Sequence, residues 1–98
     1  MINLRSPGYL IIIPRRHIET YFDLSQEEKG AIDKLIVKGK LLLDKKYSPD
    51  GYNIGTNCGF VAGQTIFHCH IHLIPRYKGD VENPQGGVRG VIPEKCIY

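Results

Sequence analysis

Three histidines alternate with apolar residues in the segment FHCHIHLIP, residues 67–75. His68, His70 and His72 occupy every second position, which is the period of a β-strand. Side chains two residues apart on a strand point to one face, so the three imidazoles should share a face. We expect Pro75 to end the strand, because proline cannot donate to a central ladder. The opposite face should enter the core, and its members are Phe67, Cys69, Ile71 and Leu73.

A long helix is predicted over residues 23–47. Ser25 and Glu28 have the spacing of a capping box, and Lys45 and Lys46 suit the negative end of the helix dipole. Apolar residues recur at helical spacing, which indicates a face that packs on a sheet. This stripe consists of Ile32, Leu35, Ile36, Gly39, Leu42 and Leu43.

Two further strands are predicted, a fully buried one over residues 8–14 (GYLIIIP) and a second over residues 51–57 (GYNIGTN). The order of strand, helix, strand and strand favours an α+β fold with an antiparallel sheet and one long helix. The 98 residues suit a single domain with its core in residues 6–76. Residues 77–98 should form a mostly irregular tail with a short strand near residues 88–92.

Composition excludes several classes of protein. A hydrophobic content of 42% and a charged content of 23% fit a globular chain, and no apolar run approaches the roughly 20 residues of a membrane span. The formal charge of +3 suits a phosphorylated ligand but is too small to indicate nucleic-acid binding. Cys58, Cys69 and Cys96 form no C-x-x-C motif, and no signal peptide is visible. Free thiols then suggest the cytoplasm.

The histidine row has four interpretations. Three purely structural histidines would each need their own hydrogen-bond partners. A metal site is chemically possible, since imidazole is a common zinc or copper ligand. An edge strand with a solvated histidine face fits poorly with Ile66 and Ile74 on the same face.

The fourth interpretation is nucleophilic catalysis at phosphorus. A neutral imidazole is a competent nucleophile near neutral pH, provided that an acceptor holds the proton on its other nitrogen. The loop AGQT, residues 62–65, should offer backbone N–H groups to a phosphate. A metal site does not predict such a loop.

The motif HCHIHLI, the preceding AGQT, the upstream GYNIGTN and the early SPGYLIIIPRRH together resemble the histidine triad (HIT) family. The tail resembles that of microbial members described as dinucleoside polyphosphate hydrolases. The resemblance implies a HIT-like α+β fold that is short at its N-terminal end.

The resemblance also implies roles for individual residues. His70 matches the nucleophile that forms a nucleotidyl-imidazole, and His72 matches the donor to phosphate or leaving-group oxygens. His68 matches the histidine that lines and orients the site, and His17 matches a supporting histidine after the first strand. The expected substrate-binding residues around the phosphates are Asn57, Gly63, Gln64 and Thr65.

The implied activity is cleavage or transfer at the α-phosphate of a nucleotide, with dinucleoside polyphosphates as the expected substrates. Alternatives are a nucleoside phosphoramidase and a non-catalytic nucleotide-binding or scaffold protein. No cofactor is expected beyond Mg²⁺ accompanying a polyphosphate. The expected partner is a second copy of the chain, paired through the helix and a strand, without membrane or nucleic acid.

The sequence departs from the family pattern in two places. Tyr9 stands where members usually have histidine after PG, which leaves the supporting role to His17. Members also carry an N-terminal segment that supplies much of the nucleoside pocket, whereas residues 1–5 alone precede Ser6 here. We therefore expect weak catalysis and poor selectivity for the base.

Overall fold

The histidine-bearing strand lies at the centre of the sheet. The computed structural model describes residues 7–95, and Cys96 and the residues before Pro7 fall outside them. Within this range, β1 (Leu10–Ile12), β2 (Gly51–Gly55) and β3 (Ile71–Arg76) form one sheet in the order β1-β3-β2. Both pairings are antiparallel, which confirms the predicted α+β fold. The central place of β3 gives its side chains neighbours on both sides.

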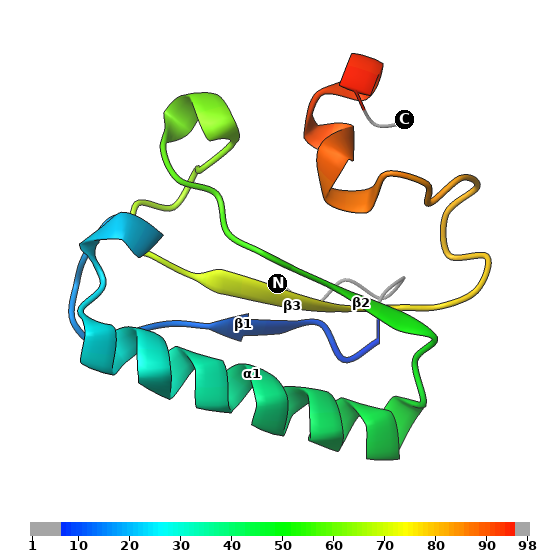
Figure 1. Ribbon diagram of the computed structural model, residues 1–98, viewed down its shortest axis with the longest axis horizontal. Coiled ribbons are helices and arrows are strands. Elements are labelled where there is room, and N and C mark those ends of the chain that lie inside the picture. The colour runs from blue at the N-terminus through cyan, green and yellow to red at the C-terminus, as the bar shows by residue number, and fades with distance from the viewer. Residues whose placement is uncertain (1–6, 96–98) are drawn as a thin grey trace.

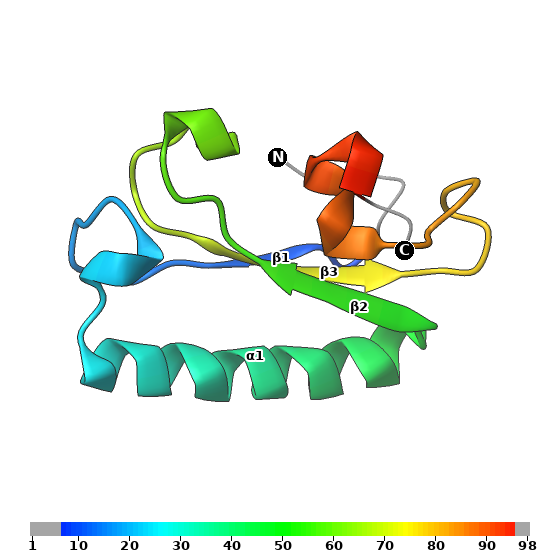
Figure 2. The same ribbon diagram turned by 45° about the horizontal axis from the view of Figure 1, so that its top comes forward.

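The helix α1 (Gln26–Tyr47) covers one face of the sheet (Figure 1). Ser25 and Glu28 form the predicted capping box, and Lys45 and Lys46 lie in the last turn. The sheet face opposite α1 faces the loops and the tail, as Figure 2 shows. Among the described residues, no helix is both long enough and apolar enough to cross a membrane.

The core lies between α1 and the sheet. Gly39 permits close packing there, because a Cβ at this position would lie 3.1 Å from the Leu10 side chain and 3.2 Å from that of Leu73. Cys69 is buried as predicted, with 1% of its surface exposed. The other buried apolar residues are Ile12, Ile18, Leu24, Ile32, Leu43, Ile71 and Leu73.

The limits of the histidine strand differ from the prediction. β3 begins at Ile71, so His68 and His70 precede it, and the side chain of Phe67 is 46% exposed rather than in the core. Pro75 lies inside β3 and pairs with Tyr52. β1 pairs with β3 as far as Leu73. Beyond Leu73, β3 pairs with β2 alone among the described residues. Its other side is therefore an edge of the sheet, and an edge tolerates proline.

Two other expectations were wrong in detail. β1 is not fully buried, because Ile11 and Ile13 point away from α1 and are 44% and 56% exposed. The apolar stripe of α1 is likewise only partly buried, because Leu35 and Leu42 are exposed to solvent. Residues 88–92 form no strand in this structure. They belong largely to the 3₁₀ helix η3 (Gly87–Val91), which follows backbone with positive φ that interrupts an extended chain.

Candidate active site

The sheet face turned away from α1 carries the polar residues. His72, Ile74 and Arg76 alternate with the buried residues of β3 and therefore share this face. On β2, Gly55 pairs with His72, and its missing side chain leaves space beside the imidazole. On β1, Ile11 pairs with His72 from the other side.

The ring of His70 is held by its own backbone. His70 Nδ1 lies 2.8 Å from the carbonyl oxygen of His68. A carbonyl can only accept a hydrogen bond, so Nδ1 carries the proton, and Nε2 of the neutral ring keeps a free lone pair. The hydroxyl of Thr56 donates to the carbonyl of His70 at 2.7 Å, which ties this residue to the end of β2.

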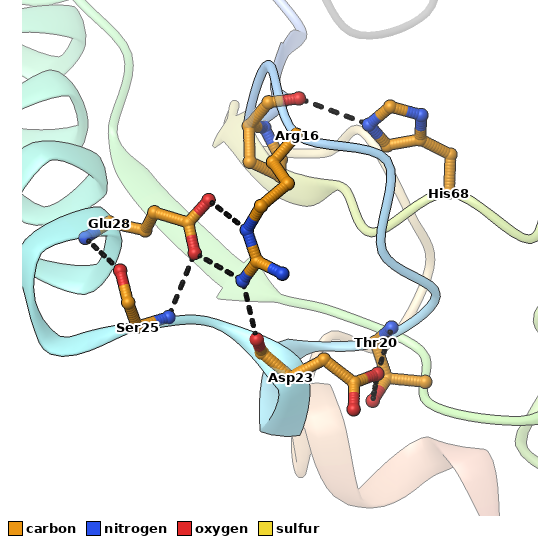
Figure 3. A network of polar contacts seen from close by, with 7 residues as sticks. Arg16, Thr20, Asp23, Ser25, Glu28 and His68 are labelled. Atoms are coloured by element: carbon orange, nitrogen blue, oxygen red, sulfur yellow. Dashed lines mark hydrogen bonds and ion pairs between the residues drawn. The ribbon is translucent and has the colours of Figure 1, made fainter.

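His68 and His17 form a pair of imidazoles in contact. His68 Nε2 lies 3.0 Å from the carbonyl oxygen of Pro14 (Figure 3), so this nitrogen donates. His68 Nδ1 lies 3.1 Å from His17 Nδ1, and the two rings meet edge to face. If both rings are neutral, His17 donates to His68. The structure thus brings together two of the histidines that the sequence singled out, from positions 51 residues apart.

The partner of His72 is Tyr9. The Tyr9 hydroxyl lies 2.8 Å from His72 Nδ1, and the ring of His70 packs against His72 on another side. Burial lowers the pKa of His72, and the charge of His70 lowers it further. Burial also raises the pKa of Tyr9, so its hydroxyl is protonated at neutral pH. Sequence analysis left the supporting role to His17 because Tyr9 replaces the usual histidine. The register of β1 on β3, which brings Tyr9 to His72, cannot be predicted from local sequence.

The segment that carries His17 is anchored to the start of α1. Arg16 pairs with Glu28 at 2.7 Å and donates to the carbonyl of Asp23 at 2.8 Å (Figure 3). The hydrogen bond from Arg16 and the backbone N–H of Ser25 lower the pKa of Glu28 to about 2. This network holds the turn after β1 in place, and with it the histidine that contacts His68.

The loop before the histidine row is internally bonded. The side chain of Gln64 is 2% exposed, accepts from the N–H of Gly59, and donates to the carbonyls of Glu19 and Ile66. Backbone N–H groups of residues 62–64 donate to carbonyls within the same loop. Gly63 has a φ of +96°, which favours glycine.

The amide donors of Gly63 and Gln64 are engaged inside the protein. The substrate contacts that we expected for both residues stay a prediction. Thr65 is exposed and does not line the cavity described next.

A cavity of about 1030 Å³ opens beside His72. Asn57 lines it, together with Tyr9 and Arg76. Arg76 donates to both carboxylate oxygens of Asp80, at 2.8 and 2.9 Å, and to the side-chain oxygen of Asn53 at 2.6 Å. Arg76, Asp80 and Asn53 were all missed by sequence reasoning, and the dipeptide PR directly after the histidine row was the available signal.

Among residues 7–95, no group of three or more histidine, cysteine, aspartate or glutamate side chains could hold a metal ion. Cys58 and Cys69 are free thiols, and burial raises the pKa of Cys69. The expected absence of a metal centre stays a prediction.

Known proteins are similar to this chain in sequence and in fold. An uncharacterised HIT-like protein of Methanocaldococcus jannaschii is 42% identical over 81 residues, which cover 83% of this chain and 62% of that protein. The asymmetrical bis(5'-nucleosyl)-tetraphosphatase of Schizosaccharomyces pombe is 36% identical over 81 residues, covering 81% of this chain and 44% of that protein. The crystal structure of a HIT family protein from Bacillus anthracis matches with a TM-score of 0.73 and 36% identity, over 78% of this chain and 54% of that one.

This chain is shorter than these relatives and spans about half of their length, between 44% and 62%. The family assignment does not depend on the remainder. Residues 1–79 match the HIT domain, and that stretch includes the helix, the three strands and the whole histidine row. The resemblance seen in the sequence is thereby confirmed, and the chain belongs to the HIT domain family.

Proposed function

We propose that this chain cleaves or transfers nucleotides at the α-phosphate through a covalent intermediate on His70. The observation that carries the proposal is the bond from His70 Nδ1 to the carbonyl of His68, which leaves Nε2 as the free nucleophile. The relative in Schizosaccharomyces pombe, named a bis(5'-nucleosyl)-tetraphosphatase, supports dinucleoside polyphosphates as the substrate class.

In the first step, His70 Nε2 attacks the α-phosphorus in line with the leaving oxygen. The P–N bond forms, the P–O bond breaks, and the leaving polyphosphate takes the bonding electron pair. The imidazole becomes positively charged, and the carbonyl of His68 stabilises it by accepting from Nδ1–H.

His72 acts on the leaving oxygen. Its lowered pKa keeps the ring neutral near pH 7. When Nδ1 accepts from the Tyr9 hydroxyl, Nε2 carries the hydrogen and donates to the developing negative charge. Water then attacks phosphorus and releases its proton to solvent, and the P–N bond breaks to restore neutral His70.

No metal is required for the nucleophile in this mechanism. Mg²⁺ would enter with a polyphosphate substrate, bound by the substrate's own oxygens. We also propose that the chain pairs with a second copy through α1 and a neighbouring strand. Exposed apolar residues on α1, including Leu41 at 63% and Leu42 at 61%, support this pairing. A monomer in sedimentation at micromolar concentration would contradict it.

The test is single-turnover trapping. The chain is mixed with a dinucleoside polyphosphate labelled at the α-phosphorus and quenched in base, in which phosphorylated histidine survives. We expect label on the peptide that contains His70 and none in the His70→Asn variant. Binding of the nucleotide without label in the intact chain would favour the non-catalytic alternative.

A further inference from the structure

His70 lies where the chain enters the sheet. The backbone ladder between β2 and β3 ends at the pair of Gly55 and His72, and that between β1 and β3 ends at the pair of Ile12 and Ile71. His70 precedes both pairs, so neither ladder fixes the backbone of the proposed nucleophile. Figures 1 and 2 show the chain leaving β1 and β2, and entering β3, at this same end of the sheet.

Two hydrogen bonds outside the ladders bracket His70. The N–H of Cys69 donates to the carbonyl of Ile18 at 2.7 Å, in the segment after β1. The hydroxyl of Thr56, the residue directly after β2, donates to the carbonyl of His70, also at 2.7 Å. Cys69 is also packed in the core, which fixes the residue before His70. The Thr56 hydroxyl holds the other side of the nucleophile.

At this point a side chain takes the place of the main chain. Gly55 faces His72 in the register of β2 on β3, so a continued ladder would place Asn57 opposite His70. The Thr56 hydroxyl donates to the His70 carbonyl instead, and the chain turns away from the sheet without leaving that acceptor unpaired. Asn57 then lines the cavity beside His72.

The main chain of His70 in turn determines the state of its ring. His70 Nδ1 bonds to the carbonyl of His68, two residues earlier, so this bond requires one conformation of the backbone between them. If that backbone turned, the bond to Nδ1 would lengthen. The ring would then exchange between tautomers, because the partner of one nitrogen decides which nitrogen carries the hydrogen. The tautomer with hydrogen on Nε2 has no lone pair there to attack phosphorus.

We propose that Thr56 is a positioning residue for His70: its hydroxyl fixes the main chain of the nucleophile and thereby keeps the ring in the tautomer that attacks phosphorus. The inference rests on the proposed function, which makes His70 the nucleophile. Because Thr56 acts through His70, loss of its hydroxyl should lower kcat and leave KM unchanged.

Two substitutions separate the hydroxyl from the rest of the side chain. Thr56→Val keeps the branched shape and removes the donor, whereas Thr56→Ser keeps the donor and removes the methyl group. We would record the ring ¹⁵N signals of His70 in the ligand-free chain and measure kcat and KM for diadenosine tetraphosphate. In Thr56→Val we expect a mixture of tautomers and a kcat about tenfold lower at unchanged KM. Thr56→Ser should restore the single tautomer and the kcat.

Ser48→Ala is the matched control, because the Ser48 hydroxyl also donates to a main-chain carbonyl, that of Asp44 at 3.3 Å, at the C-terminal end of α1. It should change neither the His70 signals nor kcat. Unchanged His70 signals in Thr56→Val, or a Thr56→Ser variant that behaves like Thr56→Val, would overturn the proposal. If Thr56→Val does not fold, Thr56→Ala removes the same hydroxyl and is judged by the same outcomes.

The ring signals and the turnover separate this proposal from the proposed function. An unaltered chain that does not hydrolyse the dinucleotide would contradict the proposed function, and the ring signals of Thr56→Val would still decide whether Thr56 holds His70. Turnover by the unaltered chain together with an equal kcat in Thr56→Val would overturn the positioning role alone.

Discussion

The two faces of β3 are separated by single residues and differ in kind. Ile71 and Leu73 point at α1 and are 4% and 1% exposed, whereas His72 and Ile74, on the other face, are half-buried. The first face contributes the burial of apolar surface. The second carries His72, and the ring of His70, directly before the strand, packs against it. Stability and chemistry should therefore be separable at adjacent positions of one strand, and each prediction below tests that separation.

The largest effect is expected on the catalytic side. His70→Ala should lower turnover of a dinucleotide by about 10³-fold or more, because no other group replaces the nucleophile. Its Tm should stay close to that of the unchanged chain, since His70 lies outside the packed core. Near-normal turnover would contradict the covalent mechanism. A large fall in Tm would contradict the separation of the two faces.

Leu73→Ala is the counterpart on the core face. It removes a side chain that is 1% exposed and packs near Leu10 and Gly39, so unfolding should become easier by about 2–5 kcal/mol. Urea denaturation measures this change. Folded protein that remains should keep most of its kcat. A stable variant with a lost kcat would show that this face also shapes the site.

Tyr9→Phe sharpens the comparison within the catalytic face. Removing one hydroxyl should lower kcat/KM about five- to tenfold, which corresponds to the net free energy of roughly one hydrogen bond. The ¹⁵N shifts of His72 should change from a ring protonated at Nε2 to a mixture of tautomers. Tyr9→His should restore part of both properties, because imidazole can also donate to His72. Unchanged shifts would exclude a positioning role.

The smallest effect concerns the Arg16–Glu28 pair at the start of α1. The pKa of Glu28 is lowered from the usual 4.5 to about 2, so the folded chain favours the ionised form of this residue. That contribution is present above about pH 4.5 and is lost as the pH falls toward 2. The Tm difference between the unchanged chain and Glu28→Gln should be visible at pH 6 and small at pH 2. A Tm difference that does not change with pH would contradict the ionisation of Glu28 as its cause.

Local patterns were enough to predict the main elements. The capping residues Ser25 and Glu28 set the start of α1 because their bonds span three positions, and period-two alternation around His72 identified the strand. The burial of Cys69 followed from the same alternation. These features depend on neighbours in the sequence, which is why they could be predicted.

Long-range geometry could not be predicted in the same way. The contact of Tyr9 with His72 depends on the register between β1 and β3, which joins positions 63 residues apart. The burial of Gln64 depends on the carbonyl of Glu19 arriving beside the loop. Phe67 was assigned to the core because the alternation was extended beyond the true start of β3.

Gln64 also limits how this site could be moved into another protein. Its side chain joins the loop at Gly59 and Ile66 to the carbonyl of Glu19, 45 residues earlier in the chain. A peptide of residues 57–76 would contain the histidine row and lack that acceptor. Transplantation would need the turn around Glu19 as well, so the smallest portable unit extends from β1 to β3. For protein engineering, the three histidines are an inseparable part of the fold rather than a motif that can be grafted.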